Sequence, residues 1–471
     1  MNKTKTPSIS LALFMGSFAS LAAYHAAAGG FEITAQSIGS QGTGHAGRSS
    51  NVADATVVYG NPAGMSFLDH AQVSVGGTGI RAYTEIDNVS SNFSADAEGS
   101  LSLLPFLPPL TFQLGPGDMG RVSGTNEGNM VPDSLIPYAF YAQPLTERLS
   151  VGFGVYVPFG ASTDYDDDFE GRYHGTLTEL SVITAQPTLS YRLTDRLSFG
   201  AGLTYNRAEG ELAVKVPHIE DAVNGTPPSP ETDEEVRVSG DDDAWGYHLG
   251  LMYRPTDATS LGLTYRSSVE FELAGDIDTT GFVQEMLPRQ PGSLDLTTPE
   301  TVNFSISHDL FEPLTLMAGA SWTRWSQFEE IAIDGEESGE RIIVEPQEYS
   351  DAWVYSVGAE YRPSSTLALR AGFAIDNSPT NDRTRSVRVP SDDRKLYSLG
   401  LGWTPLPNLS FDLAYTYINE KRTRIDQART YRGSSEALAG LIDVDADAST
   451  YYGANYETEA HAVGAAVTYR F

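Results

Sequence analysis

Cysteine is absent from the 471-residue sequence, which excludes disulfide bonds, thiolate metal sites and a cysteine nucleophile. The sequence also lacks a run of about 18 consecutive apolar residues, so we expect no membrane-spanning helix. Basic residues are scarce: 30 lysines and arginines face 62 aspartates and glutamates, and the net charge is −32. A protein that binds a phosphate backbone needs the opposite balance, and we therefore expect no nucleic-acid partner.

Catalytic and metal-binding patterns are also missing. The eight histidines are scattered without a His-x-x-x-His pair, and no G-x-S-x-G nucleophile turn occurs. Tyr173-His174 lies in a polar stretch and is interpreted as solvated. We therefore expect a protein that is not an enzyme and that has no cofactor, no catalytic residue and no metal site.

The acidic residues cluster in stretches such as 166–168, 231–235 and 241–243. We interpret these stretches as solvated outer loops that repel one another. The alternative is binding of a divalent cation, which could bridge to anionic lipid headgroups, because oxygen ligands favour calcium or magnesium.

The N-terminus has the features of a secretory signal peptide. Lys3 and Lys5 precede an apolar stretch at 9–23, and small residues at 26–29 offer a cleavage site. We expect a signal peptide over residues 1–27.

The C-terminus alternates strictly between two faces, as a β-strand does. One face is apolar and ends in aromatic residues, namely Val463, Ala465, Val467, Tyr469 and Phe471. The residues between them face the other side and are small or polar, namely Ala462, Gly464, Ala466, Thr468 and Arg470. This pattern suits the wall of an outer-membrane β-barrel, with lipid on one side and water or a plug on the other.

Short polar turns recur along the chain, and most follow a strand that ends in an aromatic residue. They lie at 144–148, 194–196, 255–257, 309–313, 363–365 and 405–408. Six turns join twelve strands, and a first strand at about 71–86 and a last at about 458–471 make fourteen. Unpaired backbone groups are costly in lipid, so a spanning sheet must close. We predict an all-β fold: a 14-stranded antiparallel transmembrane β-barrel over residues 71–471, with long outer loops at about 87–132, 160–176, 215–242, 275–298, 334–348, 376–393 and 421–457.

Residues 28–70 precede the first strand and are rich in glycine, serine and alanine. Wall side chains alone cannot fill a barrel this wide. We therefore expect this segment to form a small N-terminal hatch, or plug, inside the barrel. The apolar stretch 101–112 is interpreted either as a landing surface for a greasy substrate or as a cover packed on neighbouring loops.

Residues Gly29–Asp69, with the triplet Asn61-Pro62-Ala63, resemble the hatch of the FadL family of outer-membrane transporters for long-chain fatty acids and other hydrophobic compounds. Further similar stretches lie at 159–163, 263–267, 325–328 and 374–379. The resemblance implies passive uptake of apolar molecules: capture by the loops, movement of the hatch, and sideways release through a gap in the wall at the third strand, about 149–160.

The resemblance also directs attention to particular residues. Pro158 cannot complete a β-ladder, and Gly160 permits a bulge, so both are candidates for the lateral gate. Phe31 corresponds to an apolar hatch residue near the family's inner pocket. Arg207 and Arg370 are candidate ligand-binding residues expected to face inward, with pairing to acids such as Asp412 as the alternative.

One departure from the family bears on the substrate. Leu212 and Ala332 stand where fatty-acid-binding members carry basic residues, which weakens the case for a carboxylate headgroup and leaves neutral aromatic hydrocarbons or alkanes open. A general diffusion porin is a further alternative. The expected setting is the Gram-negative outer membrane, with lipid and lipopolysaccharide around a monomer. We expect the terminal Phe471 to be recognised by the barrel assembly machinery.

Overall fold

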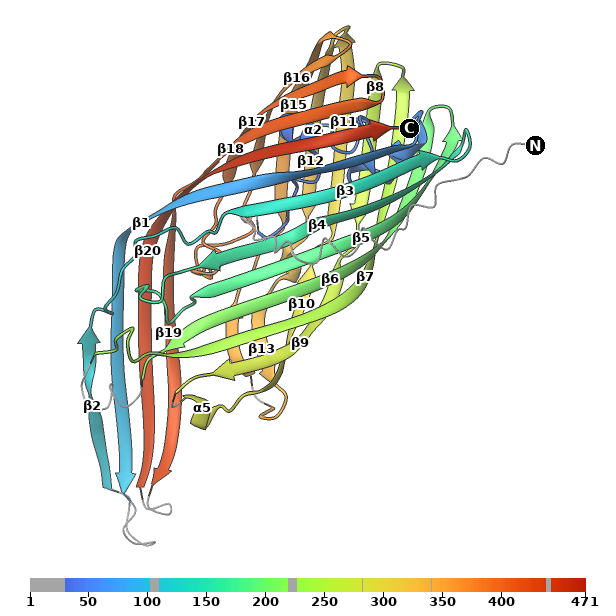
Figure 1. The fold of residues 1–471 in the computed structure, drawn as a ribbon. Coiled ribbons are helices and arrows are strands. Elements are labelled where there is room, and N and C mark those ends of the chain that lie inside the picture. Colours follow the sequence, from blue (N-terminus) through green and yellow to red (C-terminus); the bar gives the residue numbers. More distant parts are fainter. Residues whose placement is uncertain (1–29, 102–109, 219–226, 282, 340, 438–441) are drawn as a thin grey trace.

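The structure is a computed structural model, and it describes residues 30–101, 110–218, 227–281, 283–339, 341–437 and 442–471. Its strands form one antiparallel sheet that closes into a fourteen-strand barrel, as predicted (Figure 1). Closure occurs where β1 (Gln72–Leu101) pairs with β20 (Ile442–Arg470) on one side and with β3 (Ser134–Pro144) on the other.

The remaining strands follow one another around the wall. Their bounds are β2 Leu110–Gly120, β4 Leu149–Asp164, β5 Leu177–Thr194, β6 Leu197–Val216, β7 Glu234–Thr256, β8 Thr259–Arg266, β9 Val269–Thr279, β10 Gln290–Thr298, β11 Thr301–Phe311, β12 Leu314–Thr323, β13 Glu330–Gly335, β14 Arg341–Pro346, β15 Ala352–Ser364, β16 Leu367–Asp376, β17 Arg394–Leu406, β18 Leu409–Glu420 and β19 Thr423–Ala437. The helices are short: α2 Ile38–Gly42, α3 Val57–Gly60, η1 Pro62–Phe67, α5 Val283–Met286 and η2 Trp325–Gln327.

All six predicted turns join neighbouring strands at the end of the barrel where the C-terminus lies (Figure 1). The aromatic residues beside them point outward. Tyr191, Tyr253, Tyr361 and Trp403 are each more than two-fifths exposed, as expected for an interfacial girdle.

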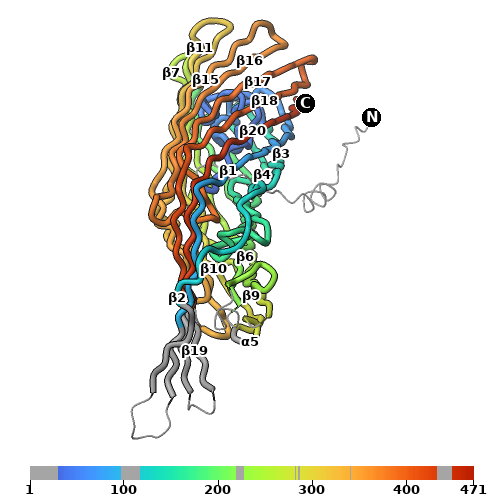
Figure 2. Tube along the Cα trace, turned by 90° about the vertical axis from the view of Figure 1, so that its left-hand side faces the viewer, coloured from blue at the N-terminus to red at the C-terminus, as the bar shows by residue number. Residues whose placement is uncertain are grey.

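Three of the predicted long loops, 87–132, 275–298 and 421–457, are wrong in large part. In the second of them, β9 continues to Thr279 and β10 begins at Gln290. β1 continues to Leu101 and β20 begins at Ile442, and β2 and β19 extend this pair into a four-stranded stalk (Figure 2). These strands leave the barrel wall, where lipid no longer imposes an apolar outer face, while side chains nearer the barrel such as Phe93, Ile425 and Tyr452 are buried. The acidic run 241–243 likewise lies in β7 rather than in a loop.

Residues 30–70 lie inside the barrel, at the end that holds the six turns (Figure 1). α2 packs on β17 and β18, and η1 packs on β5, β6 and β7. The approach is close enough that a Cβ on Gly262 would lie 1.9 Å from the Ser49 carbonyl oxygen, and one on Gly372 would lie 2.0 Å from Thr43. The wall carries glycine there because a larger residue would collide with the N-terminal segment.

Four neighbouring strands of the wall are each interrupted, and the two parts of each carry separate labels: β8 and β9, β10 and β11, β12 and β13, and β14 and β15. The backbone groups freed at these breaks are hydrogen-bonded across them. Arg324 N donates to the Glu300 carbonyl at 3.0 Å, and Ser267 N donates to the Tyr247 carbonyl at 2.9 Å. Such breaks are tolerated at membrane depth where protein covers them, and here they make room for side chains from η2.

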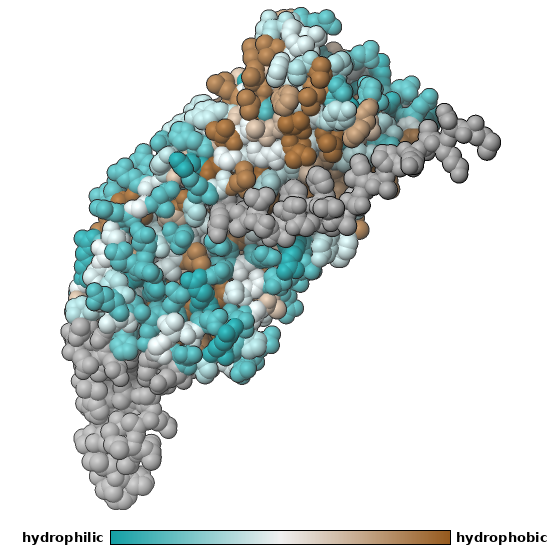
Figure 3. Space-filling view, viewed as in Figure 1, coloured by the Kyte–Doolittle hydropathy of each residue, from teal (hydrophilic) through white to brown (hydrophobic). Residues whose placement is uncertain are grey.

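Apolar residues gather on the outer surface around β15–β18 and β20, while the half nearer the stalk is mostly hydrophilic (Figure 3). The outward face of β20 includes Val463, Val467, Tyr469 and Phe471, as the alternation predicted. No helix within the described ranges is both long and apolar enough to span a membrane. The expected signal peptide and most of the apolar stretch 101–112 fall outside the described residues.

Candidate functional site

The wall is incomplete between β3 and β4. Their ladder runs from the Pro144–Ser150 pair to the Ala139–Val155 pair and ends there. Beyond it, residues 134–138 of β3 pair only with β1, and β4 continues to Asp164 paired with β5 alone. One edge of β4 is therefore left without a wall partner.

The N-terminal segment occupies this edge. Ile33 N donates to the Pro158 carbonyl at 2.7 Å, and Gly160 N donates to the Phe31 carbonyl at 2.9 Å, so Glu32 lies directly opposite Phe159. In an antiparallel ladder the pair formed by residues 33 and 158 would exchange two hydrogen bonds. Pro158 has no amide hydrogen, so only one of the two is made.

Side chains of the N-terminal segment also fill the gap between β3 and β4. Ile33 packs in one buried cluster with Ile136 of β3 and Val157 of β4, and the Gln36 side chain donates to the Val157 carbonyl. The register of β4 against β5 shifts between Tyr156 and Phe159, at the same level. The gap in the wall is thus filled by residues of the N-terminal segment rather than by a strand.

Phe31 lies at the centre of an aromatic cluster beside the gap. Its ring centroid is 4.6 Å from Trp325, 5.3 Å from Phe328 and 6.0 Å from Phe159, in edge-to-face contacts. Tyr349 packs on Phe328 at 5.0 Å. Trp325 and Phe328 belong to η2 and the residue after it, in the interruption between β12 and β13. The stretch 325–328 that resembles the family therefore contributes aromatic side chains to this cluster.

An apolar cavity adjoins this cluster, and we call it the Leu212 cavity. It encloses about 730 Å³ of space free of protein atoms, part of it open to solvent. Its walls include Phe31, Leu212, Leu273, Leu296, Phe328 and Ile333. The charged residues that line it are Glu179 and Glu211, and no lysine, arginine or histidine among the described residues does so.

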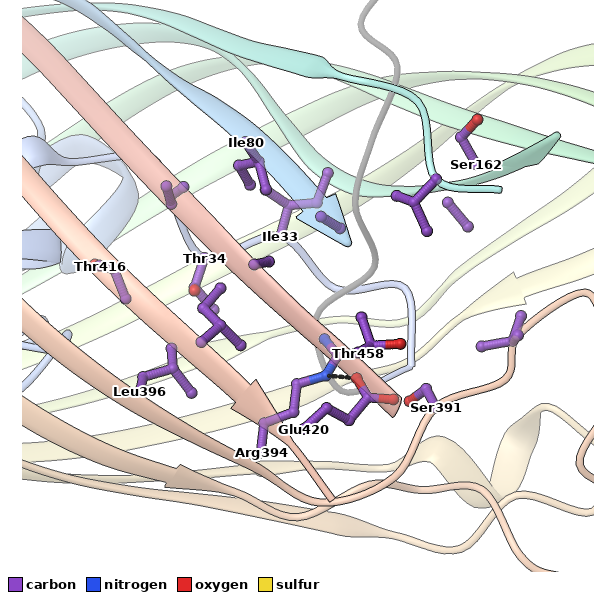
Figure 4. A pocket seen from close by; sticks show the side chains of 18 of the residues that line it. Ile33, Thr34, Ile80, Ser162, Ser391, Arg394, Leu396, Thr416, Glu420 and Thr458 are labelled. Atoms are coloured by element: carbon purple, nitrogen blue, oxygen red, sulfur yellow. Dashed lines mark hydrogen bonds and ion pairs between the residues drawn. The ribbon is translucent and has the colours of Figure 1, made fainter. Parts of the chain in front are cut away.

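A second cavity, the Leu396 cavity, lies between the N-terminal segment, the 388–391 loop and the strands β1, β17, β18 and β20. It encloses about 1020 Å³ and is lined mainly by apolar side chains and hydroxyl groups (Figure 4). Of its charged groups, Arg394 and Glu420 pair with each other at 2.6 Å, and Arg388 pairs with Glu345 at 3.2 Å. Ala161 and Val389 line both cavities, so the two adjoin at the end of β4.

The Asn61-Pro62-Ala63 triplet fastens the N-terminal segment to the wall. Asn61 caps η1 by accepting from Ala63 N at 3.0 Å, and its Nδ2 donates to the carbonyls of Ser49 and Leu251. The Ala63 carbonyl accepts from Ser198 Oγ at 2.8 Å. The triplet lies apart from the residues that line the two apolar cavities.

Arg370 faces inward, as predicted. Its guanidinium pairs with Asp412, the predicted partner, and with Glu360 at 2.6 Å. All three side chains are largely buried, and the arginine donates through Nε to Glu360 and through Nη1 to Asp412. This triad is far more suited to holding the plug–wall contact than to receiving a ligand.

The expectation that Arg207 faces inward is wrong. On β6 the even-numbered residues from Ser198 to Ala208 face the interior, so Arg207 points outward. It is 45% exposed and pairs with Glu209 on its own strand and with Asp241 and Asp243 on β7. Arg207 therefore cannot contribute to an internal ligand site.

The interpretation of Tyr173-His174 as solvated is also wrong. Both side chains are buried where the 165–176 loop folds over the barrel mouth, and burial lowers the pKa of His174 to about 3. Beside them Glu345 of β14 accepts hydrogen bonds from both Arg388 and Arg429, so that one buried carboxylate joins the loop after β16 to β19. A polar sequence did not predict this burial because the partners come from distant parts of the chain.

Sequence reasoning missed several residues of the site. Ile333 and Tyr349 flank the stretch 334–348 that was assigned to a loop, and nothing in their local pattern indicates a cavity. Phe159 lies within a stretch that resembles the family. Its position next to Pro158 could have indicated that it lies at the gap.

Comparisons with known proteins agree with this architecture. Residues 19–471 match the family described as "Outer membrane protein transport protein (OMPP1/FadL/TodX)". Outer membrane protein P1 of Haemophilus influenzae is 28% identical over 461 residues, covering 94% of this chain and 95% of the relative. A long-chain fatty acid transport protein of Escherichia coli O6:H1 is 25% identical over 446 residues, covering 88% of this chain and 92% of the relative.

Solved structures share the fold. A FadL homologue of Pseudomonas aeruginosa superposes with a TM-score of 0.73 at 24% identity, covering 94% of this chain and all of that one. The toluene transporter TbuX of Ralstonia pickettii gives a TM-score of 0.60 at 16% identity, covering 92% of this chain and 97% of that one. With the outer-membrane relatives, the closed barrel places this protein in the Gram-negative outer membrane. The chain belongs to the OMPP1/FadL/TodX family of outer-membrane transporters for hydrophobic compounds.

Proposed function

We propose that this protein takes up neutral hydrophobic molecules passively and releases them sideways through the gap between β3 and β4. The observation that carries the proposal is the occupation of the free edge of β4 by residues 31–33 of the N-terminal segment. A segment held by two backbone hydrogen bonds and apolar contacts can leave and return without breaking the wall.

The proposed route uses the two adjoining cavities. A molecule captured among the outer loops enters the Leu396 cavity and passes Ala161 and Val389 into the Leu212 cavity, where Phe31 forms part of the wall. Withdrawal of residues 31–33 from β4 then opens the gap to the surrounding lipid. Residues 28–70 act as the movable hatch in this scheme, with Asn61-Pro62-Ala63 as its fixed end and Pro158 and Gly160 on the gate strand.

The charge of the Leu212 cavity favours a neutral substrate. A fatty acid carboxylate binds best to a lysine or arginine in a dry pocket. Here Leu212 lies in the lining, and the charged lining groups, Glu179 and Glu211, would repel an anion. Aromatic hydrocarbons and alkanes therefore fit better than free long-chain fatty acids, which are the alternative substrates.

No step of this scheme needs covalent chemistry, and we propose a transporter without enzymatic activity. We further propose that it works as a monomer surrounded by lipid and lipopolysaccharide, with Phe471 as its signal to the assembly machinery. Phe471 is 69% exposed at the end of β20, so a partner can reach it.

Uptake by cells that lack this protein, with and without a plasmid copy, tests the proposal. We expect the copy to accelerate uptake of toluene and a medium-chain alkane, and to accelerate uptake of laurate much less. Faster entry of a small hydrophilic solute with no effect on hydrocarbons would contradict the proposal and favour a diffusion porin. Replacing Leu212 with arginine should move the preference toward laurate, because it supplies the missing cation.

A further inference from the structure

Arg48 lies inside the plug without an acidic partner. Its Nη2 donates to Ser321 Oγ of β12 at 3.4 Å, and its Nη1 is buried with no hydrogen-bond partner. No carboxylate of the described residues lies within ion-pair distance of this guanidinium, in contrast to Arg370, which lines the same cavity. A partly buried guanidinium without a counter-charge favours an anion that can reach it.

A polar cavity adjoins Arg48, and we call it the Arg48 cavity. It encloses about 510 Å³, part of it open to solvent. Six residues with side-chain hydrogen-bonding groups line it besides the two arginines and Tyr59, namely Thr34, Ser37, Ser40, Thr43, Asn51 and Thr56. Ser40 Oγ is a second buried atom there with no hydrogen-bond partner. The lining thus supplies two unused hydrogen-bonding groups, one of them cationic.

The other charged groups near the cavity interact with partners other than Arg48. Arg370 is neutralised by Glu360 and Asp412. Arg266, on the far side of Tyr59, stacks on that ring at 4.8 Å and donates to Tyr156 Oη at 2.7 Å, again without an ion pair within the described part of the chain. Asp54 is the acid nearest to Arg48 in sequence, and its Oδ1 accepts from Thr56 N at 2.8 Å. The next acid toward the N-terminus, Glu32, accepts from Thr323 Oγ1 through its Oε2.

We propose that the Arg48 cavity binds a small monovalent anion, a halide or a carboxylate, through Arg48 Nη1 and the Ser40 hydroxyl. Arginine donates only, so the ligand must accept, and a charged acceptor gives the stronger hydrogen bond. The bound anion would fasten the plug at its contact with β12, because Nη2 of the same guanidinium donates to Ser321. Thr34 lines both this cavity and the Leu396 cavity, which offers a path of entry.

The direct test is the anomalous signal of bromide in crystals of the full chain grown or soaked in sodium bromide. We expect a peak within hydrogen-bond distance of Arg48 Nη1. In parallel, the thermal unfolding midpoint of the detergent-solubilised protein is followed as chloride or acetate replaces gluconate at constant ionic strength. The midpoint should rise with either small anion, and Arg48→Gln should weaken the apparent affinity at least tenfold.

Arg81→Gln is the matched control, because Arg81 pairs with Asp133 on the outer surface and is 59% exposed. It should leave the anion dependence unchanged. Arg48→Lys keeps the charge and should retain part of the response. If Arg48→Gln does not fold, the bromide peak in the unaltered protein still decides. Absence of a peak beside Arg48, or an anion response that Arg48→Gln leaves intact, would overturn the proposal.

Discussion

Arg370 illustrates what a single buried charge does in this barrel. It could be assigned an inward direction and a partner, Asp412, from alternation alone, because both lie on regular wall strands. Glu360 was not predicted, since its proximity depends on the pairing of β15 with β16, where it lies directly opposite Arg370. The inward direction predicted for Arg207 is wrong because the sequence did not establish which residues of β6 face the interior.

Replacing Arg370 with methionine should destabilise the barrel by about 3–5 kcal/mol, because it leaves the buried Asp412 without a counter-charge and Glu360 with only the exposed Arg362. The measurement is equilibrium unfolding in urea with lipid vesicles. Adding Glu360→Gln and Asp412→Asn to the same chain should recover most of the loss. Equal stability of the single and triple variants would show that the charge pairing is unimportant.

His174 gives a pH-dependent prediction. Its ordinary pKa is about 6.5 and the folded value is about 3, so the unfolded loop binds the proton more readily. The contribution of neutral His174 to the stability of the folded 165–176 loop is therefore fully present above about pH 6.5. It is lost as the pH falls toward 3. At pH 5 the cost is about 2 kcal/mol, from about 1.36 kcal/mol for each unit.

Protease cleavage in the 165–176 loop, measured between pH 7 and pH 4 with an acid-tolerant protease, checks this effect. Cleavage should accelerate as the pH falls. In a His174→Gln variant that still folds, the rate should vary much less, and an equal acceleration in both proteins would assign the effect to other groups.

At the scale of elements, the wall strands were predictable because lipid outside and a filled interior impose strict alternation. The six turns and the last strand follow from that constraint. The stalk strands β2 and β19 were not predictable, since they leave the wall and lipid imposes no apolar outer face on them. The gap beside β4 was indicated by Pro158, but its filling by residues 31–33 depends on a contact more than a hundred residues apart in sequence.

Pro158 limits how firmly the N-terminal segment is held. Alanine at this position has an amide hydrogen, which could donate to the Ile33 carbonyl. The added hydrogen bond between β4 and the N-terminal segment is worth about 0.5–1.5 kcal/mol. We expect Pro158→Ala to slow hydrocarbon uptake roughly two- to tenfold. Pro187→Ala is the matched control, because Pro187 lies within the β5 wall opposite Phe153 and away from the gap. Equal uptake by both variants would argue against release along β4.

At the scale of the whole molecule, the closed barrel holds the N-terminal segment inside it, and its two apolar cavities adjoin at the end of β4. The plug is fixed at η1 by the Asn61 contacts and at α2 by the Gln41 side chain, which donates to the Ala462 carbonyl and accepts from Thr78 Oγ1. Its first residues are held at the gap, by the Glu32–Thr323 hydrogen bond and by the aromatic contacts of Phe31. This difference in attachment is the reason to assign movement to residues 30–36 rather than to the entire plug.

The most direct test of that claim is a reversible disulfide between positions 32 and 159. Glu32 and Phe159 form a directly opposed antiparallel pair of the narrow kind, with an expected Cα separation of about 4.5 Å, which a disulfide can span. The chain has no cysteine of its own, so Glu32→Cys with Phe159→Cys introduces the sole pair. Toluene uptake should stop when this pair is oxidised and return on reduction, while each single variant is insensitive to oxidant. Undiminished uptake by the fully oxidised double variant would contradict the account.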